Sequence, residues 1–538
     1  MSLDYDALVV GAGFGGIHQT YKLRELGLSV KTIDVAGDVG GTWFWNRYPG
    51  AMSDTHSPAY RFTFDLDDLK TYPWEHNYVK QPEVLAYLRH VVERHNLRQH
   101  FQFNTELLSA TYAPETRTWT SVLSTGETLT TRYLVLALGL LSKTHWPSIP
   151  GLDTFKGTLV HSSRWPEGLD LNGKRVGVIG NGSTGVQIIT DLAPKVASLV
   201  SYQRTPQHSV PTGYAPFTPA EREALNANWD AQIARVRESV SGFGFEEATT
   251  RWVDTPEAER EAVFERTWRL GNGFQFLFGA FADVATDRGA NDAAAAFVVK
   301  KIGQLVKDPE KTRKLTPSGG YNRRPLCDSG YYESFNRPNV DVELLTENPI
   351  DAVTPKGIRT KDGREREFDA IICATGFDAV EGNFLRVQIK GASETLAEHW
   401  GRVGVTSYAG IAAAGFPNLF LVLGPAGPFV NLPAAIEAQS DFIADLIAKT
   451  EAGGARRVVE VREEAEREWA KVCERIGGGS IFRDTASWIF GSNIEGKKDA
   501  VRFYFAGLGA YRKALEEERA RGYEAFRIAA VEGVEARL

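Results

Sequence analysis

The chain has 538 residues, of which 43% are hydrophobic and 24% are charged, and its formal net charge is −7. This length predicts two or three domains, and the acidic balance offers no basic surface for nucleic acid or an anionic membrane. The three cysteines form no CxxC pair and no metal-ligand cluster, which argues against a disulfide framework, a metal centre and a disulfide reductase. No basic leader or apolar run of membrane length is visible, so we expect a soluble, cytoplasmic enzyme.

The first predicted unit begins almost at once. Ala7–Val10 is a short apolar run, typical of a buried parallel strand, and it leads into a GxGxxG turn at residues 11–16. We expect a helix to about residue 26, then a strand over 29–33 that ends in Asp34. Strand, turn and helix predict a dinucleotide site, with a pyrophosphate at the helix N-terminus and Asp34 on a ribose hydroxyl.

Two further segments of this unit follow. Residues 40–54 form a loop rich in glycine and aromatic residues that ends in a lone carboxylate, Asp54, which needs a cationic partner. Residues 101–140 alternate as antiparallel strands do, and they close on a buried strand over 133–139 that ends in glycine.

The same order of elements recurs later in the chain. A strand over 175–179 leads into a second glycine turn at 180–185 and a helix, and the next strand ends in Arg204 followed by Thr205. A guanidinium suits a 2′-phosphate, which an acid would repel, so the predicted ligand is NADPH. Arg323 is a candidate for a second positive charge; the alternative for Arg204 is an ordinary surface arginine.

These elements predict an α/β fold with two Rossmann-type dinucleotide-binding domains and a helical insertion in the second. The expected boundaries are 1–145 and 385–538 for the first domain, 146–215 and 313–384 for the second, and 216–312 for the insertion, which is rich in Ala, Glu and Arg. Charged helices are expected near 463–474 and 510–522.

Two longer patterns carry a resemblance to a known family. Residues 155–166 read F-x-G-x-x-x-H-x-x-x-W-P, and residues 40–54 read G-G-x-W-x-x-x-x-Y-P-G-x-x-x-D. Both resemble the fingerprints of the Baeyer–Villiger monooxygenases. Further segments, at 328–333, 335–340, 423–429 and 487–498, are similar to the cyclohexanone monooxygenase branch, so the resemblance spans almost the whole chain.

The resemblance implies a reaction. FAD is expected in the first unit and NADPH in the second, with O2 and a ketone, cyclic by preference, as substrates. The ketone would become an ester or lactone through a flavin C4a-peroxide and a Criegee adduct. Arg324 would face the flavin, pair with Asp54 and stabilise the anionic peroxide, so these two residues are the predicted catalytic pair.

The resemblance also suggests roles for the linker and for a lid. His161 is expected to anchor the linker by hydrogen bonds, with Trp165 packed beside it, and neither is expected to do chemistry. Residues 487–498 would form a mobile lid that closes over the nicotinamide and carries Trp488. Position 323 is arginine where close relatives usually have lysine, which leaves the pose of the nicotinamide cofactor open.

Two sets of residues complete the predicted site. The cofactor-binding residues are Gly11, Gly13, Phe14, Gly16, Asp34, Gly41, Thr42, Trp43, Trp45, Asp54, Tyr60, Gly180, Gly182, Ser183, Thr184, Gly185, Arg204, Thr205, Arg323 and Trp488. The substrate pocket, placed mainly by the resemblance, is Leu140, Leu141, Phe245, Phe276, Phe278, Phe429, Leu432 and Trp488; packing in the core is the alternative for many of them.

Two other functions stay open at this stage. A flavin-containing monooxygenase of thioethers or amines would share both glycine turns, but its linker pattern ends differently from Trp165-Pro166. A non-catalytic flavoprotein that senses NADP(H) has no need of Asp54 and Arg324 together. The oligomeric state stays undetermined, and a monomer is compatible with the sequence.

Overall fold

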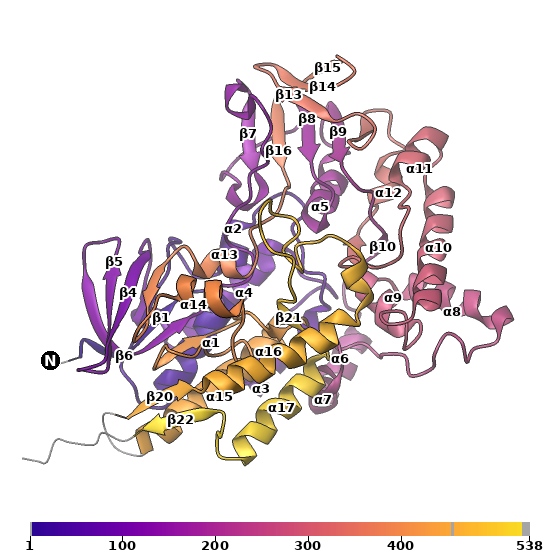
Figure 1. Cartoon of the computed structure of the whole chain (residues 1–538). Helices are drawn as coiled ribbons and strands as arrows, with labels where there is room; N and C mark the ends of the chain where they lie inside the picture. The colour runs from indigo at the N-terminus through magenta and orange to yellow at the C-terminus, as the bar shows by residue number, and fades with distance from the viewer. Residues whose placement is uncertain (1–2, 453–456, 530–538) are drawn as a thin grey trace, which may run out of the picture.

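The computed structural model describes residues 3–452 and 457–529, and its architecture rests on two separate sheets (Figure 1). The first sheet forms around β1 (Tyr5–Val10), whose residues from Ala7 onward are buried because they are uniformly apolar. β1 pairs in parallel with β2 (Val30–Ile33) and with β6 (Thr128–Leu136). The expected Rossmann-type core of the first unit is therefore present.

The rest of the first sheet comes from three parts of the chain. Its other strands are β3 (Phe101–Gln102), β4 (Leu107–Ala113), β5 (Thr118–Leu123), β17 (Gln388–Lys390) and β18 (Leu419–Leu421). The order is β17-β4-β5-β6-β1-β2-β3, with β18 also on β6. β4, β5 and β6 pair antiparallel, as the alternation over 101–140 predicts.

The second sheet is entirely parallel and lies at the top of Figure 1. Its strands are β7 (Thr158–His161), β8 (Arg175–Ile179), β9 (Ser198–Gln203), β12 (Val340–Leu344) and β16 (Ala370–Cys373), in the order β12-β9-β8-β16-β7. The predicted fold class, two Rossmann-type units in one α/β chain, is confirmed.

Smaller sheets complete the set of strands. β13 (Ile350–Val353), β14 (Gly357–Thr360) and β15 (Glu365–Glu367) form an antiparallel meander. Three strand pairs join β10 (Ser209–Pro211) to β11 (Leu326–Asp328), β19 (Gly427–Pro428) to β21 (Phe503–Tyr504), and β20 (Val458–Val461) to β22 (Phe526–Ala529).

Helices cover the sheets and fill the space between the units. α1 (Phe14–Glu25) packs beside the long α15 (Leu432–Ala452) under the first sheet, and α5 (Ser183–Leu192) follows the second glycine turn. The helical insertion comprises α6 (Pro219–Ala227), α7 (Trp229–Glu238), α8 (Glu257–Leu270), α9 (Gly273–Gly279), α10 (Arg288–Leu305) and α11 (Pro309–Leu315). The C-terminal helices are α16 (Glu463–Gly478) and α17 (Leu508–Ala520), close to the expected positions.

The remaining helices are short, apart from α4. They are α2 (Thr42–Trp45), α3 (Leu66–Thr71), α4 (Gln81–Arg94), α12 (Tyr331–Ser334), α13 (Glu381–Phe384) and α14 (Leu396–Val403). None of the helices within 3–452 and 457–529 is long and apolar enough to cross a membrane.

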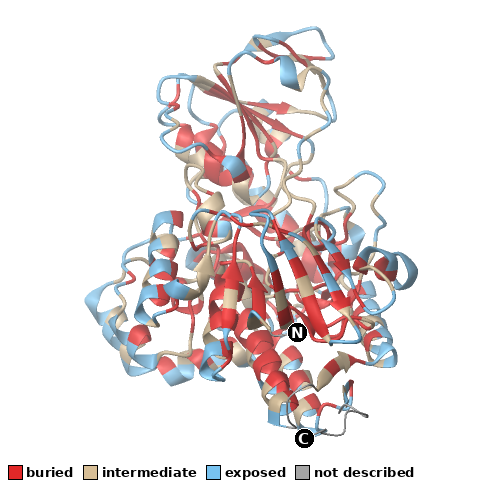
Figure 2. Cartoon of the chain, turned by 90° about the vertical axis from the view of Figure 1, so that its left-hand side faces the viewer, coloured by how far each residue is buried: buried red, intermediate tan, exposed pale blue. Residues whose placement is uncertain are grey.

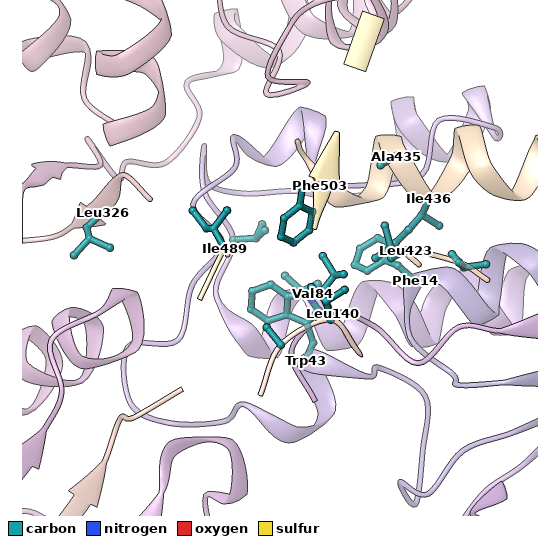
Figure 3. Packing of buried hydrophobic residues seen from close by; sticks show 14 of the residues in the cluster. Phe14, Trp43, Val84, Leu140, Leu326, Leu423, Ala435, Ile436, Ile489 and Phe503 are labelled. Carbon is teal, nitrogen blue, oxygen red and sulfur yellow. The ribbon is translucent and has the colours of Figure 1, made fainter. Parts of the chain in front are cut away.

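The core concentrates at the sheets and at the helices against them, where Figure 2 shows mostly buried residues. Phe14 at the start of α1, Trp43, Leu140, Leu423 and Ile436 belong to one buried hydrophobic cluster, part of which Figure 3 shows. The domain boundaries given above stay a proposal. Their physical basis is that β17 and β18, from beyond residue 385, join the first sheet, whereas β16 joins the second.

Candidate active site

The two glycine turns share the same backbone conformation at their first glycine. Gly11 has φ +113°, and a Cβ there would lie 2.3 Å from the carbonyl oxygen of Ala137; Gly180 has φ +107°, and its Cβ would lie 2.4 Å from that of Ala374. Only glycine fits such a close approach between turn and strand. At the middle glycine of the second turn, Gly182, a Cβ would meet none of the described atoms within 4 Å, so the start of α5 is open to a phosphate group.

The residue at the end of the second strand differs between the turns. In the first unit the Asp34 carboxylate accepts from the backbone N–H of Ala12 (2.6 Å) and of Ala36 (2.7 Å). Burial raises the pKa of Asp34, and these two bonds offset the rise only in part. The acid is thus fixed at the edge of the turn, where a ribose of a bound dinucleotide would lie.

The second unit places two cations at the matching edge. Arg204 follows β9 and is exposed, whereas Arg323 is half-buried and donates to the carbonyl oxygen of Ala486 at 3.3 Å. Burial and the nearby charge of Arg204 lower the pKa of Arg323. Among the residues that the structure describes, neither arginine has a carboxylate within ion-pair distance. Two uncompensated guanidinium groups beside a glycine turn suit a phosphate.

The aromatic loop at 40–54 joins the two units. Trp43 is buried and its Nε1 donates to the hydroxyl of Tyr60 at 3.0 Å. The Tyr48 hydroxyl donates to Oε1 of Gln187 in α5 at 2.9 Å, and a Cβ at Gly50 would lie 2.6 Å from the carbonyl oxygen of Gln187. The loop therefore belongs to the first unit but docks on the first helix of the second.

Asp54 and Arg324 form an ion pair at this junction. Nη2 of Arg324 lies 2.8 Å from Oδ2 of Asp54, which is 8% exposed. Nη1 of Arg324 donates to the hydroxyl of Ser183, the first residue of α5, at 2.6 Å. Its guanidinium carbon lies 5.1 Å from the ring centre of Phe274. The predicted pair thus exists, and one arginine touches the aspartate of the first unit and the glycine turn of the second.

The surroundings of Arg324 favour its charged form by raising its pKa. Burial lowers the pKa of Arg324, but the Asp54 carboxylate outweighs it, so the pKa is raised overall. The second carboxylate oxygen of Asp54, Oδ1, is buried and has no hydrogen-bond partner within the described chain. Because buried polar atoms are normally satisfied, this oxygen indicates room for a further polar group at the site.

The linker pattern packs against the aromatic loop. The Arg164 guanidinium carbon lies 4.3 Å from the ring centre of Trp45, and Arg47 pairs with Glu167 at 3.4 Å. His161 is buried and its Nδ1 accepts from the backbone N–H of Ser163 at 3.2 Å, while burial lowers its pKa to about 4. A neutral, buried histidine that caps its own turn matches an anchoring role better than a general base.

The predicted pocket residues divide into two groups. Leu141, Phe245, Phe278, Phe429, Leu432 and Trp488 are half-buried and Leu140 is buried at the loop. Phe276 is 0% exposed and its ring packs against those of Phe264 (5.5 Å) and Phe297 (5.8 Å). These contacts place Phe276 in the core of the insertion, on the side of α9 opposite Phe274 and Phe278, which favours the alternative of core packing for this residue.

The predicted lid segment contacts residues of both units. Trp488 packs on Phe429 (6.1 Å between ring centres) and on Phe503 (6.0 Å). Lys497 pairs with Asp378 at 2.7 Å and with Glu381 at 3.0 Å. The segment is thus tied by charge to the residues that follow β16, while its mobility stays a prediction.

Several residues of the site escaped the sequence analysis. Gln187 holds the aromatic loop, Phe274 packs on Arg324, and Asn272 donates through Nδ2 to the carbonyl oxygen of Asp54 at 2.6 Å. Gln187 and Phe274 sit in ordinary helical patterns. Asn272 had a signal, since Gly271-Asn272-Gly273 is a turn sequence inside an otherwise helical stretch.

Comparisons with known proteins agree with this geometry. A family model described as flavin-binding monooxygenase-like matches residues 6–207. A Baeyer–Villiger monooxygenase of Pseudooceanicola batsensis is 47% identical, over 97% of this chain and 95% of that protein. A phenazine N-monooxygenase of Lysobacter antibioticus is 46% identical, over 97% of this chain and 96% of that protein.

The solved structures show the same likeness. A crystal structure of cyclohexanone monooxygenase from Rhodococcus sp. Phi1 bound to NADP⁺ superposes with a TM-score of 0.96 at 48% identity. The match covers 98% of this chain and 99% of that one. The likeness therefore extends over both sheets, the insertion and the C-terminal helices.

Proposed function

This chain belongs to the Baeyer–Villiger monooxygenases, and we propose that it uses NADPH and O2 to oxygenate a ketone, preferably a cyclic one, to a lactone or ester. Its cofactors are FAD and NADPH. The observation that carries the proposal is the ion pair of Arg324 and Asp54 at 2.8 Å, at the junction of the two nucleotide units.

The residues present fit both cofactors. In the first unit, Asp34 and the turn at Gly11 suit the adenosine and pyrophosphate of FAD, and the aromatic loop with Trp43 and Tyr60 would lie along the flavin. In the second unit, the open start of α5 suits the pyrophosphate of NADPH, and Arg204 with Arg323 suits its 2′-phosphate. The unpartnered Oδ1 of Asp54 offers an acceptor to one of the bound groups.

Bound FAD, reduced by NADPH, supplies the electrons that activate O2. Arg324 contributes a fixed positive charge next to the site where oxygen and ketone meet. Negative charge develops on the carbonyl oxygen as the ketone is attacked, and a preorganised guanidinium stabilises it. Asp54 orients that guanidinium through Nη2, and Ser183 orients it through Nη1, so the charge needs no rearrangement during the reaction.

The pocket residues indicate an apolar, compact substrate. Leu141, Phe278 and Phe429 offer aliphatic and aromatic surface, and Trp488 of the lid packs on Phe429. Such walls exclude water from the reacting groups. They give no charged partner for an acidic or basic substrate beyond the ion pair itself, which favours a neutral ketone.

Replacing the arginine tests the assignment. Arg324→Ala is expected to keep FAD and NADPH oxidation but to lower ester formation by about 10²–10³-fold, the effect of removing one preorganised charge. Because the variant leaves the Asp54 carboxylate unpaired, the double variant Arg324→Ala with Asp54→Asn is the control for that unpaired charge. Undiminished ester formation in Arg324→Ala would contradict the catalytic role of Arg324. A wild-type enzyme that oxygenates thioethers or amines but no ketone would move the proposal to those substrates.

A further inference from the structure

Asn272 occupies an unusual position between the insertion and the site. It is 1% exposed, it has φ +71°, and it is the N-cap of α9. Its own N–H donates to the carbonyl oxygen of Pro211 at 2.7 Å, which attaches the turn to β10. A non-glycine residue in this conformation is uncommon and persists only where the surrounding structure holds it.

Both ends of the Asn272 amide are used. Its Oδ1 accepts from the backbone N–H of Phe274 (2.8 Å) and of Gln275 (3.3 Å), which caps the helix. Its Nδ2 donates to the carbonyl oxygen of Asp54 at 2.6 Å and to the hydroxyl oxygen of Tyr78 at 3.2 Å. Because backbone N–H groups only donate and a carbonyl only accepts, these partners fix the orientation of the amide.

The two ends lead to two of the neighbours of the Arg324 guanidinium, Asp54 and Phe274. One end holds the main chain of Asp54, whose carboxylate pairs with Arg324 at 2.8 Å. The other caps the helix that carries Phe274, whose ring centre lies 5.1 Å from the same guanidinium carbon. Among the residues that the structure describes, Asn272 is the one that holds the main chain of Asp54 by a hydrogen bond.

We infer that Asn272 is a positioning residue for the oxygenation step: it fixes the Asp54–Arg324 ion pair and the Phe274 ring at defined positions relative to each other. The inference rests on the proposed roles of Asp54 and Arg324. It assigns to the insertion a part in the chemistry, because displacement of this one amide moves the carboxylate and the aromatic wall together. Misplacing a catalytic charge by about 1 Å is enough to change rates by up to about 10²-fold.

The test is the isosteric variant Asn272→Asp. Aspartate keeps the shape and the helix cap but puts an oxygen, not an N–H, against the carbonyl of Asp54. With cyclohexanone, NADPH and O2, it is expected to lower kcat for ester formation by about tenfold, and the NADPH no longer used for ester to appear as hydrogen peroxide. Flavin content and the KM for NADPH are expected to stay at wild-type values, which a general loss of structure would not allow.

Asn272→Gly is the second variant, because glycine accepts the positive φ and removes both sets of side-chain bonds. If the aspartate variant does not retain flavin, the glycine variant tests the positioning role of Asn272 in its place. Asn418 supplies the matched control: it is also 1% exposed, has φ +58°, and accepts from the N–H of Val459 at 2.9 Å, far from Arg324 in sequence and beside β18. Asn418→Asp and Asn418→Gly are expected to couple NADPH to ester as the wild type does.

Two outcomes would overturn the inference. One is a yield of ester per NADPH within about twofold of wild type in the Asn272 variants, since a misplaced charge is expected to cost more. The other is an equal loss in the Asn418 variants, which would reduce the effect to general destabilisation. If the wild-type enzyme itself makes no ester, the proposed function fails first, and the parallel wild-type assay separates that result from the other two.

Discussion

The two glycine turns have nearly the same backbone but opposite charge at the end of the next strand. Behind the first turn, the Asp34 carboxylate is bound by two amides of its own unit. Behind the second, Arg204 and Arg323 lie near each other, and within the described chain neither has an acidic partner. We therefore propose that each turn binds a pyrophosphate, whereas the residue at the strand end distinguishes a free ribose hydroxyl from a 2′-phosphate.

The chemistry belongs to neither turn alone. Arg324 contacts Ser183 of the second turn and Asp54 of the loop that follows the first. We therefore propose that bound NADPH and bound FAD would both lie near this guanidinium.

Alanine at two glycines should have very different results. At Gly16 a Cβ would lie 1.6 Å from the carbonyl oxygen of Gly11, so Gly16→Ala is expected to abolish FAD binding and the folding of the first unit. At Gly182 a Cβ would meet none of the described atoms within 4 Å, so Gly182→Ala should fold with full flavin content. Its methyl group should raise the KM for NADPH about tenfold, because that glycine admits the pyrophosphate.

Flavin absorbance per protein and the KM for NADPH measure both variants. Equal flavin loss in the two would contradict the view that the turns bind different dinucleotides.

Removal of Arg204 or Arg323 should weaken the preference for NADPH over NADH. Arg204→Ala and Arg323→Ala should each lower kcat/KM for NADPH about tenfold or more, as expected for a charge-assisted hydrogen bond of about 1.5–3 kcal/mol. The kcat/KM for NADH should hardly change, because NADH has no 2′-phosphate. A parallel fall with both cofactors would show that these arginines support the fold rather than the phosphate.

A smaller effect concerns the pH dependence of stability, to which His399 and His161 contribute with opposite signs. In His399, burial lowers the pKa, but bonds to Glu466 (3.1 Å) and Glu394 (3.0 Å) raise it overall above 6.5. A raised pKa in the folded state means that this histidine stabilises the protein below about pH 6.5 and loses that contribution as the pH rises through the folded value. In His161, burial lowers the pKa to about 4, so stability is lost as the pH falls from about 6.5 towards 4.

Thermal unfolding across pH measures both histidines. His399→Gln should lower the Tm more at about pH 5.5 than at about pH 9, whereas His161→Gln should reduce the loss of Tm on acidification. A pH-independent change in both variants would contradict these signs.

Local patterns predicted most of the architecture. The apolar run at Ala7–Val10, the glycine turns and the residues that end the following strands are all readable within about 25 residues of each other, since a βαβ unit is a local motif. The pairing of Asp54 with Arg324 came from a family pattern, because 270 positions separate the two residues and no local rule joins them.

Contacts between distant segments were harder to foresee. The resemblance suggests Phe276 for the pocket and leaves core packing as the alternative, and the ring contacts of Phe276 inside the insertion favour the core, because one helix presents alternate positions to opposite sides. The bond from Asn272 to Asp54 depends on a left-handed turn in the insertion that docks on a loop of the first unit. Such long-range placement is a property of the packed structure, not of either segment.

We propose that the two units and Arg324 together oxygenate a ketone. The most direct measurement mixes the enzyme, reduced anaerobically with NADPH, with ¹⁸O2 in the presence of cyclohexanone and follows the mass of the product. The expected product is a lactone that is one oxygen atom heavier than the ketone and carries the label. Unchanged cyclohexanone, with all reducing equivalents recovered as hydrogen peroxide, would contradict it.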